Sequence, residues 1–140
     1  MEQRDLLKDQ IEQLGKVLAE ILSDFLGLKS KGSINEGIKI SKERLQSELD
    51  IDIEKLITLN KTKLKEYVKN LKLSEGHLEI LSEYLKEMGM VKNRANIGEA
   101  KLCLEKALEL LDVADEISNT LSFDRINKKT KIENMLQQNL

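Results

Sequence analysis

The sequence predicts an all-α protein of about six to seven helices, arranged as stacked antiparallel helical hairpins. The composition indicates this first: proline is absent, aromatic residues make up 3% of the 140 residues, and charged residues make up 34%, against about a quarter in an average domain. Leu, Ile, Glu and Lys dominate, as in helical proteins. Apolar residues also recur at helical spacing. A chain of this length can bury one self-sufficient core, so we predict a single domain over residues 1–140.

The first third of the chain predicts two long helices. Apolar residues step by three and four through residues 3–29, which is typical of an amphipathic helix, and Gly32 supplies its end. Ser33 and Glu36 have the spacing of a capping box. In this motif the serine hydroxyl accepts a hydrogen bond from the amide three residues on, and the glutamate carboxylate accepts one from the amide of the serine. We therefore expect a second helix to begin there and to end near Leu49.

Two short helices are expected next. Residues 50–60 predict a helix of two or three turns, with Asp52 as its cap, and residues 62–71 predict another. The side chains expected to be buried are Ile53, Leu56 and Ile57 in the first, and Leu64, Tyr67, Val68 and Leu71 in the second.

Residues 81–112 show the helical pattern most clearly, as two helices joined by a turn. We expect Ser74 to cap the first of them, and Met88 to lie near its end. Gly89 then stands where a helix commonly leaves through a left-handed residue. The second helix should begin near Asn96.

Small residues shape the expected packing of this hairpin. Ala100 and Ala107 are seven residues apart on one face and would allow a facing helix to approach closely. Residues 112–120 fit either a continuation of that helix or a turn. Ser122 is the expected cap of a last helix over residues 123–138, whose apolar face is sparse.

An internal repeat supports the prediction of hairpins. Glu36-Gly37 and Arg44-Leu45 are matched by Glu99-Ala100 and Ala107-Leu108, 63 residues later. This offset is close to twice the helical-hairpin period of roughly 34 residues. The spacing resembles the second helix of a tetratricopeptide repeat, on Tyr84, Met88-Gly89, Ile97, Ala100, Leu104 and Ala107 in the later copy and on Leu26-Gly27, Gly32, Ile34 and Gly37 in the earlier one.

The layout is also similar to a family of small, uncharacterised bacterial all-helical proteins. Four segments carry this resemblance: residues 11–22, 32–49 and 81–89, and the helix containing EAKLCLEKALELL. The resemblance implies a tetratricopeptide-like domain of unknown function, with no active site to carry across.

No residue pattern indicates catalysis or metal binding. His77, the single histidine, has leucines four residues away on both sides, and Cys103, the single cysteine, lies on an apolar face. Glu105 and Glu109 lack a matching pair and the Glu-x-x-His pattern of di-iron proteins. We therefore expect no enzyme activity, no cofactor, and no catalytic, cofactor-binding or metal site.

Charge is balanced overall and patterned locally. The 23 basic and 25 acidic residues give a net charge of −2, which disfavours nucleic acid as a partner. A lysine stripe is formed by Lys61, Lys65, Lys69 and Lys72. It fits a solvated face better than a phosphate-binding track, and its counterpart is an acidic segment holding Glu99, Glu105, Glu109, Asp112, Asp115 and Glu116. Such patches can meet inside one fold or between two copies.

The expected compartment is a bacterial cytoplasm. A single cysteine forms no internal disulfide, and no run approaches the roughly 20 apolar residues of a membrane span. The opening MEQRDLLKDQ is acidic and polar, whereas a signal peptide is basic and then apolar.

The function these features favour is a non-catalytic protein-interaction or scaffold module of helical-hairpin repeats that binds a protein or peptide. The predicted partner surface comprises Tyr67, Lys69, Tyr84, Lys86 and Arg94. Two alternatives stay open. One is a self-associating structural protein, for example a homodimer, suggested by the wide apolar stripe of the first helix with its flanks Leu6, Val17 and Leu26. The other is a helical domain that binds a small ligand between helices.

Overall fold

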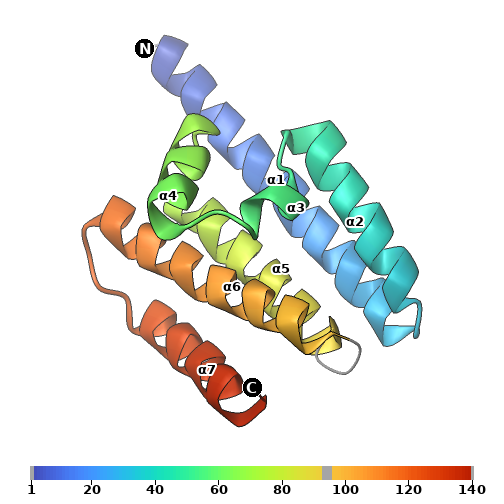
Figure 1. The fold of residues 1–140 in the computed structure, drawn as a ribbon. Helices are drawn as coiled ribbons and strands as arrows, with labels where there is room; N and C mark the ends of the chain where they lie inside the picture. The colour runs from blue at the N-terminus through green and yellow to red at the C-terminus, as the bar shows by residue number, and fades with distance from the viewer. Residues whose placement is uncertain (1, 93–95, 140) are drawn as a thin grey trace. The chain divides into compact units, whose positions relative to one another are not determined.

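The computed structural model describes residues 2–92 and 96–139, and this part of the chain contains seven helices and no strand (Figure 1). The all-α prediction is confirmed. The helices are α1 (Glu2–Ser30), α2 (Ile34–Leu49), α3 (Ile53–Leu56), α4 (Lys61–Asn70), α5 (Glu75–Lys92), α6 (Ile97–Ser118) and α7 (Phe123–Asn139).

Close contacts divide the chain into two compact units, Met1–Ile53 and Glu54–Leu140, with α3 crossing the boundary. Each unit is described by itself. The expected single domain over residues 1–140 stays a prediction.

The first unit is the α1–α2 hairpin. Gly32 turns the chain with a φ of +80°, as its place in the sequence predicted, and the Ser33 amide donates to the Leu28 carbonyl at 2.9 Å. The predicted capping box is wrong: Ser33 is the N-cap of α2, but its side chain makes no capping hydrogen bond. Its backbone, with φ −97° and ψ 52°, lacks the extended conformation that aims a cap hydroxyl at the helical amides. The two helices approach each other closely at Gly37, because a Cβ added there would lie 3.2 Å from Leu28 Cβ.

Helix α2 ends where the sequence predicted. Asp50 adopts the left-handed conformation, and its amide donates to the Gln46 carbonyl at 3.1 Å. This bond is that of the αL helix-ending motif, and the Ile51 amide also donates to the Leu45 carbonyl at 3.0 Å.

Helix α3 is a single turn rather than the predicted two or three. The amides of Thr58 and Leu59 donate to carbonyls only three residues earlier, and the Thr58 hydroxyl donates to the Lys55 carbonyl at 2.7 Å. These bonds tighten the chain and occupy the acceptors that another α-helical turn would need. The Asn60 side chain then accepts from the Lys63 amide and starts α4. The predicted buried residues Ile53, Leu56 and Ile57 are indeed buried.

Helices α5 and α6 form the central antiparallel hairpin of the second unit (Figure 1). The Ser82 hydroxyl donates to the Ala107 carbonyl at 2.8 Å, and a Cβ on Gly89 would lie 3.2 Å from the Ala100 carbonyl oxygen and 3.0 Å from Leu104 Cγ. Small residues seven apart on one helix therefore face small residues seven apart on the other. The expected close approach at Ala100 and Ala107 is confirmed.

Gly89 itself does not end α5, contrary to the prediction. The helix continues to Lys92, and Gly89 is buried inside it. The absence of a side chain serves the contact with α6 rather than a left-handed exit.

For the last two helices, the structure decides between the two alternatives left open for residues 112–120 and confirms the predicted cap of α7. Helix α6 continues through residues 112–118 and ends at Asn119, which adopts the left-handed conformation. The Ser122 hydroxyl accepts from the Arg125 amide at 3.3 Å and caps α7. Of the apolar residues of α7, Ile132 is buried, while Ile126 is exposed. The apolar contribution to holding α7 is therefore small.

Candidate functional site

Arg125 occupies the centre of an ion-pair network that fastens α7 to α5 and α6. Arg125 is only 4% exposed to solvent. Its Nε donates to Asp115 Oδ1 at 2.7 Å, and its Nη1 donates to Glu75 Oε2 at 3.0 Å and lies 3.6 Å from Glu79 Oε2. One guanidinium thus joins the carboxylates of two other helices.

Two lysines on the same face of α7 extend this network. Lys128 pairs with Glu79 at 3.3 Å, and Lys129 pairs with Asp112 at 2.8 Å and with Asp115. Helix α7, whose apolar face is sparse, is therefore held largely by charge. We call Arg125, Lys128, Lys129 and their carboxylate partners Glu75, Glu79, Asp112 and Asp115 the ionic clamp.

The clamp favours the charged forms of Asp115 and Lys129. Burial alone would raise the pKa of Asp115, but hydrogen bonds from Lys129 and Arg125 outweigh it and lower that pKa. Burial likewise opposes the charge of Lys129, and its bonds to Asp112 and Asp115 raise its pKa overall. Groups that stay charged through neutral pH are suited to holding helices together and poorly suited to proton transfer.

The clamp also fixes the turn between α6 and α7. The Nη2 of Arg125 donates to the Ser118 hydroxyl at 2.9 Å and to the Thr120 carbonyl at 3.2 Å. Four exposed apolar residues lie close to this turn in the sequence, and we call them the apolar corner: Ile117, Leu121, Phe123 and Ile126. Leu121 is 82% exposed and Phe123 is 86% exposed.

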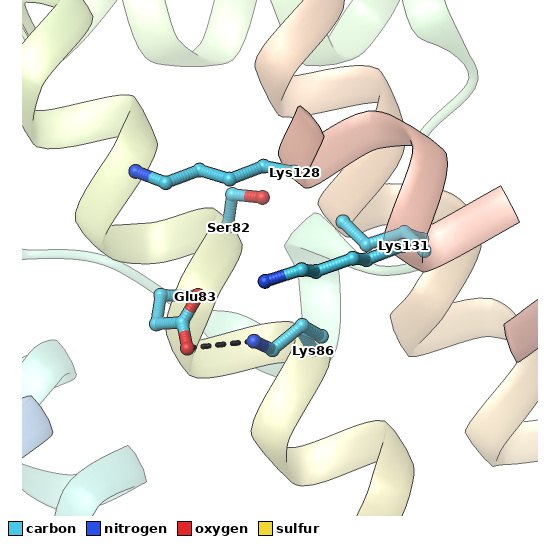
Figure 2. Close-up of a pocket in the computed structure, with 6 residues that line it drawn as sticks. Ser82, Glu83, Lys86, Lys128 and Lys131 are labelled. Atoms are coloured by element: carbon cyan, nitrogen blue, oxygen red, sulfur yellow. Dashed lines mark ion pairs between the residues drawn. The ribbon is translucent and has the colours of Figure 1, made fainter. Parts of the chain in front are cut away.

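A small hollow lies between α5 and α7 (Figure 2). Its volume is about 180 Å³, below the roughly 300–1,000 Å³ of drug-sized ligand sites. The residues that line it are Ser82, Glu83, Lys86, Lys128, Lys131 and Ile132. Three ammonium groups and one carboxylate thus supply its charges.

The structure places the five predicted partner-binding residues in different surroundings. Tyr67 is half-buried on α4 with the Lys55 ammonium 5.7 Å from its ring centre, and Lys69 is exposed on the same helix. Tyr84 is 2% exposed, so its assignment to a partner surface is wrong: its ring belongs to the core. Lys86 lines the hollow, and Arg94 lies outside the described residues.

Part of the lysine stripe meets the acidic segment inside the second unit. Lys61 pairs with Asp112 at 3.5 Å and Lys65 with Glu116 at 2.8 Å, which joins α4 to α6. Lys72 lies beyond the end of α4 with a φ of 59°, so the four lysines do not share one helical face as predicted.

His77 and Cys103 are both buried. The Ser74 amide donates to His77 Nδ1 at 2.9 Å, and the Ser74 hydroxyl accepts from the His77 amide at 3.5 Å. This is the reciprocal arrangement of a capping box with histidine in the place of glutamate. Within the described ranges no group of three or more His, Cys, Asp or Glu side chains could hold a metal ion.

Sequence reasoning missed the ionic clamp and the apolar corner. A signal for the clamp was present, since Arg125, Lys128 and Lys129 share one face of the predicted last helix and follow the acidic end of the helix before it. The corner gave no such signal, because the burial of an apolar residue beside a turn depends on which side chains pack against it from other helices.

Comparisons with protein-family models, with curated proteins and with solved structures find no match to this chain. No helix in the described part of the chain combines the length and apolarity needed to cross a membrane. The fold therefore defines the class to which the protein belongs, the all-α proteins.

Proposed function

We propose that this protein is a non-catalytic protein-interaction module, and that the apolar corner is its docking surface. The observation that carries the proposal is the exposure of Leu121 and Phe123, each more than four-fifths accessible and only two residues apart. Single exposed apolar residues are ordinary on protein surfaces, but a group of large ones marks a site of association.

The energetic reason is the apolar area left in water. Burying a leucine or phenylalanine side chain is worth about 1.5–3 kcal/mol. A partner that covers Leu121 and Phe123 gains most of this for both, and Ile117 and Ile126 add to it. Phenylalanine is also among the residues enriched at protein interfaces.

The corner is held in place before a partner arrives. Arg125 bonds to the Ser118 hydroxyl and to the Thr120 carbonyl, so the turn that presents Leu121 is tied to a buried side chain. A preformed surface pays less ordering entropy on binding than a flexible loop does.

The partner that fits this surface best is an amphipathic helix of another protein. Its apolar side chains at three- and four-residue spacing would cover the short group of Ile117, Leu121, Phe123 and Ile126. Glu116 precedes the group in the sequence and Asp124 lies within it, and both residues are exposed. Each pairs with one lysine of this chain, and their charge favours basic residues beside the partner's apolar face.

One further feature supports a scaffold of hairpin repeats. The α1–α2 and α5–α6 hairpins each bring a small residue, Gly37 and Ala100, against the preceding helix, and these are the two residues that the 63-residue repeat aligns. The tetratricopeptide-like arrangement, the absence of enzyme activity and a bacterial cytoplasmic location all belong to this proposal.

The test compares the wild type with two surface variants by affinity capture from a lysate of the native host. The Leu121→Ser, Phe123→Ser variant should lose a protein that the wild type captures. The Ile97→Ser variant, which removes an exposed apolar side chain at the start of α6, should keep it. The captured protein is then purified and its affinity for both variants is measured by calorimetry. Equal capture by all three proteins would end the proposal.

Sedimentation of the purified protein separates the self-association alternative. If the wild type is a dimer and the Phe123→Ser variant is a monomer, the corner binds a second copy of this chain and not a different partner.

A further inference from the structure

We propose that the hollow between α5 and α7 binds one phosphate-type oxyanion. This site is separate from the apolar corner and does not depend on the function proposed above. Lys86 lines the hollow from α5, and Lys128 and Lys131 line it from α7. In Figure 2 the Lys131 side chain extends from α7 toward α5, and Lys86 is turned toward Glu83.

Lys131 supplies the charge that is not already used. It forms no ion pair with any residue in the described part of the chain, although it lines a hollow that two other lysines line as well. An ammonium group without a carboxylate partner, close to others of the same charge, attracts a dianion.

The other two lysines are already positioned by carboxylates. Lys86 pairs with Glu83 at 2.8 Å and lies 3.9 Å from Glu87. Lys128 pairs with Glu79 at 3.3 Å. Their side chains therefore point in fixed directions, and an anion in the hollow competes chiefly with Glu83, the one carboxylate that lines it.

This competition sets the expected strength. Binding of the anion must draw Lys86 away from Glu83, so the affinity is modest in the natural sequence. Removing the charge of Glu83 should strengthen binding, whereas removing the charge of Lys131 should weaken it. A non-specific attraction to surface lysines would not depend on Glu83 in this way.

The volume limits the ligand to a small one. A cavity of about 150 Å³ accepts one benzene molecule, so the hollow of about 180 Å³ accepts one phosphate group and few further atoms. Its ligand is inorganic phosphate or the phosphate end of a small monoester.

The experiment is a titration of the isotope-labelled full chain with inorganic phosphate and, separately, with glycerol phosphate, at constant ionic strength. Amide shifts should concentrate at Ser82, Glu83, Lys131 and Ile132. Equal binding of the two ligands identifies phosphate itself, and tighter binding of glycerol phosphate identifies a monoester.

Three variants test the assignment. Lys131→Gln should weaken binding about fivefold or more, the loss expected for one charge-assisted contact, and Glu83→Gln should tighten it. Lys101→Gln, which removes an exposed lysine of α6 that pairs with Glu105 at 4.0 Å, should change nothing. Thermal melts establish that each variant is folded. Shifts spread over all exposed lysines, or equal affinities in Lys131→Gln and Lys101→Gln, would overturn the proposal, as would weaker binding in Glu83→Gln.

Discussion

Replacing Arg125 by methionine tests whether charge holds α7 in place. Methionine keeps much of the volume and flexibility of the arginine stem but donates no hydrogen bond. The change removes the hydrogen bonds to Asp115 and Glu75 and the ion pair with Glu79. It also removes the two hydrogen bonds that fix the turn at Ser118 and Thr120.

The structure sets the size of the effect. Removing one partner of a fully buried ion pair costs about 3–5 kcal/mol. Here Asp115 keeps Lys129, and the Glu75 side chain is 47% exposed and can be hydrated. We therefore expect Arg125→Met to lower the free energy of unfolding by about 2–3 kcal/mol, less than a fully buried pair would lose. For a chain of this size that lowers Tm by roughly 10 °C.

Arg44 provides a matched control. It also binds three carboxylates, those of Glu20, Asp24 and Glu48, at 3.2, 2.8 and 2.6 Å. Its side chain is 24% exposed and those of its partners are 41–65% exposed. Exposed pairs of this kind are worth about 0–1 kcal/mol, so Arg44→Met should cost less than about 1 kcal/mol.

The assay combines thermal unfolding of both variants with hydrogen exchange of the α7 amides. Arg125→Met should speed exchange throughout α7, because the helix detaches more often. If Arg125→Met were no more destabilising than Arg44→Met, or if the α7 amides exchanged at the wild-type rate, the ionic clamp would not be what holds this helix.

Three further predictions concern single residues. Gly89→Ala should destabilise the protein by about 1 kcal/mol or more, because the new Cβ would press on Leu104. Gly76→Ala should stabilise it by up to about 1 kcal/mol, because the new Cβ meets no atom closer than 3.9 Å. Urea denaturation measures both changes, and the same sign for both would contradict this packing. The pKa of Asp115 is lowered in the folded state, so its contribution to stability is complete above the ordinary carboxyl pKa of about 3.9 and is lost as the pH falls through the lower folded pKa. Asp115→Asn should remove that part of the decrease of Tm in acid. The same decrease of Tm in the variant and the wild type would refute this prediction. Lys72→Gly should raise the urea midpoint, since Lys72 has a φ of 59° at a cost of about 1 kcal/mol that glycine does not pay, and a lower midpoint would count against strain at this residue.

Local patterns in the sequence were enough to predict where the helices lie, apart from the length of α3 and the end of α5. The step of three and four among apolar residues predicted each helix, and Gly32, Asn96 and Ser122 marked boundaries that the structure confirms. Such signals act between residues close in the chain, so they can be read without knowing the fold.

The candidate sites depended on which residues come together from separate helices. The position of Gly89 in the sequence predicts a helix end, whereas the residue lies inside α5 opposite Ala100 and Leu104. Tyr84 is predicted to lie on the surface, whereas it is buried. Neither outcome is encoded within one helix.

The sequence by itself determined that the chain is helical and where most helices begin and end, because hydrogen bonding and capping involve neighbours in the chain. The tertiary structure alone decided that Arg125 is buried among carboxylates of α5 and α6, and that Leu121 and Phe123 are left in water. Burial and ion pairing depend on the side chains that face a residue from other helices, and helical periodicity does not specify those partners.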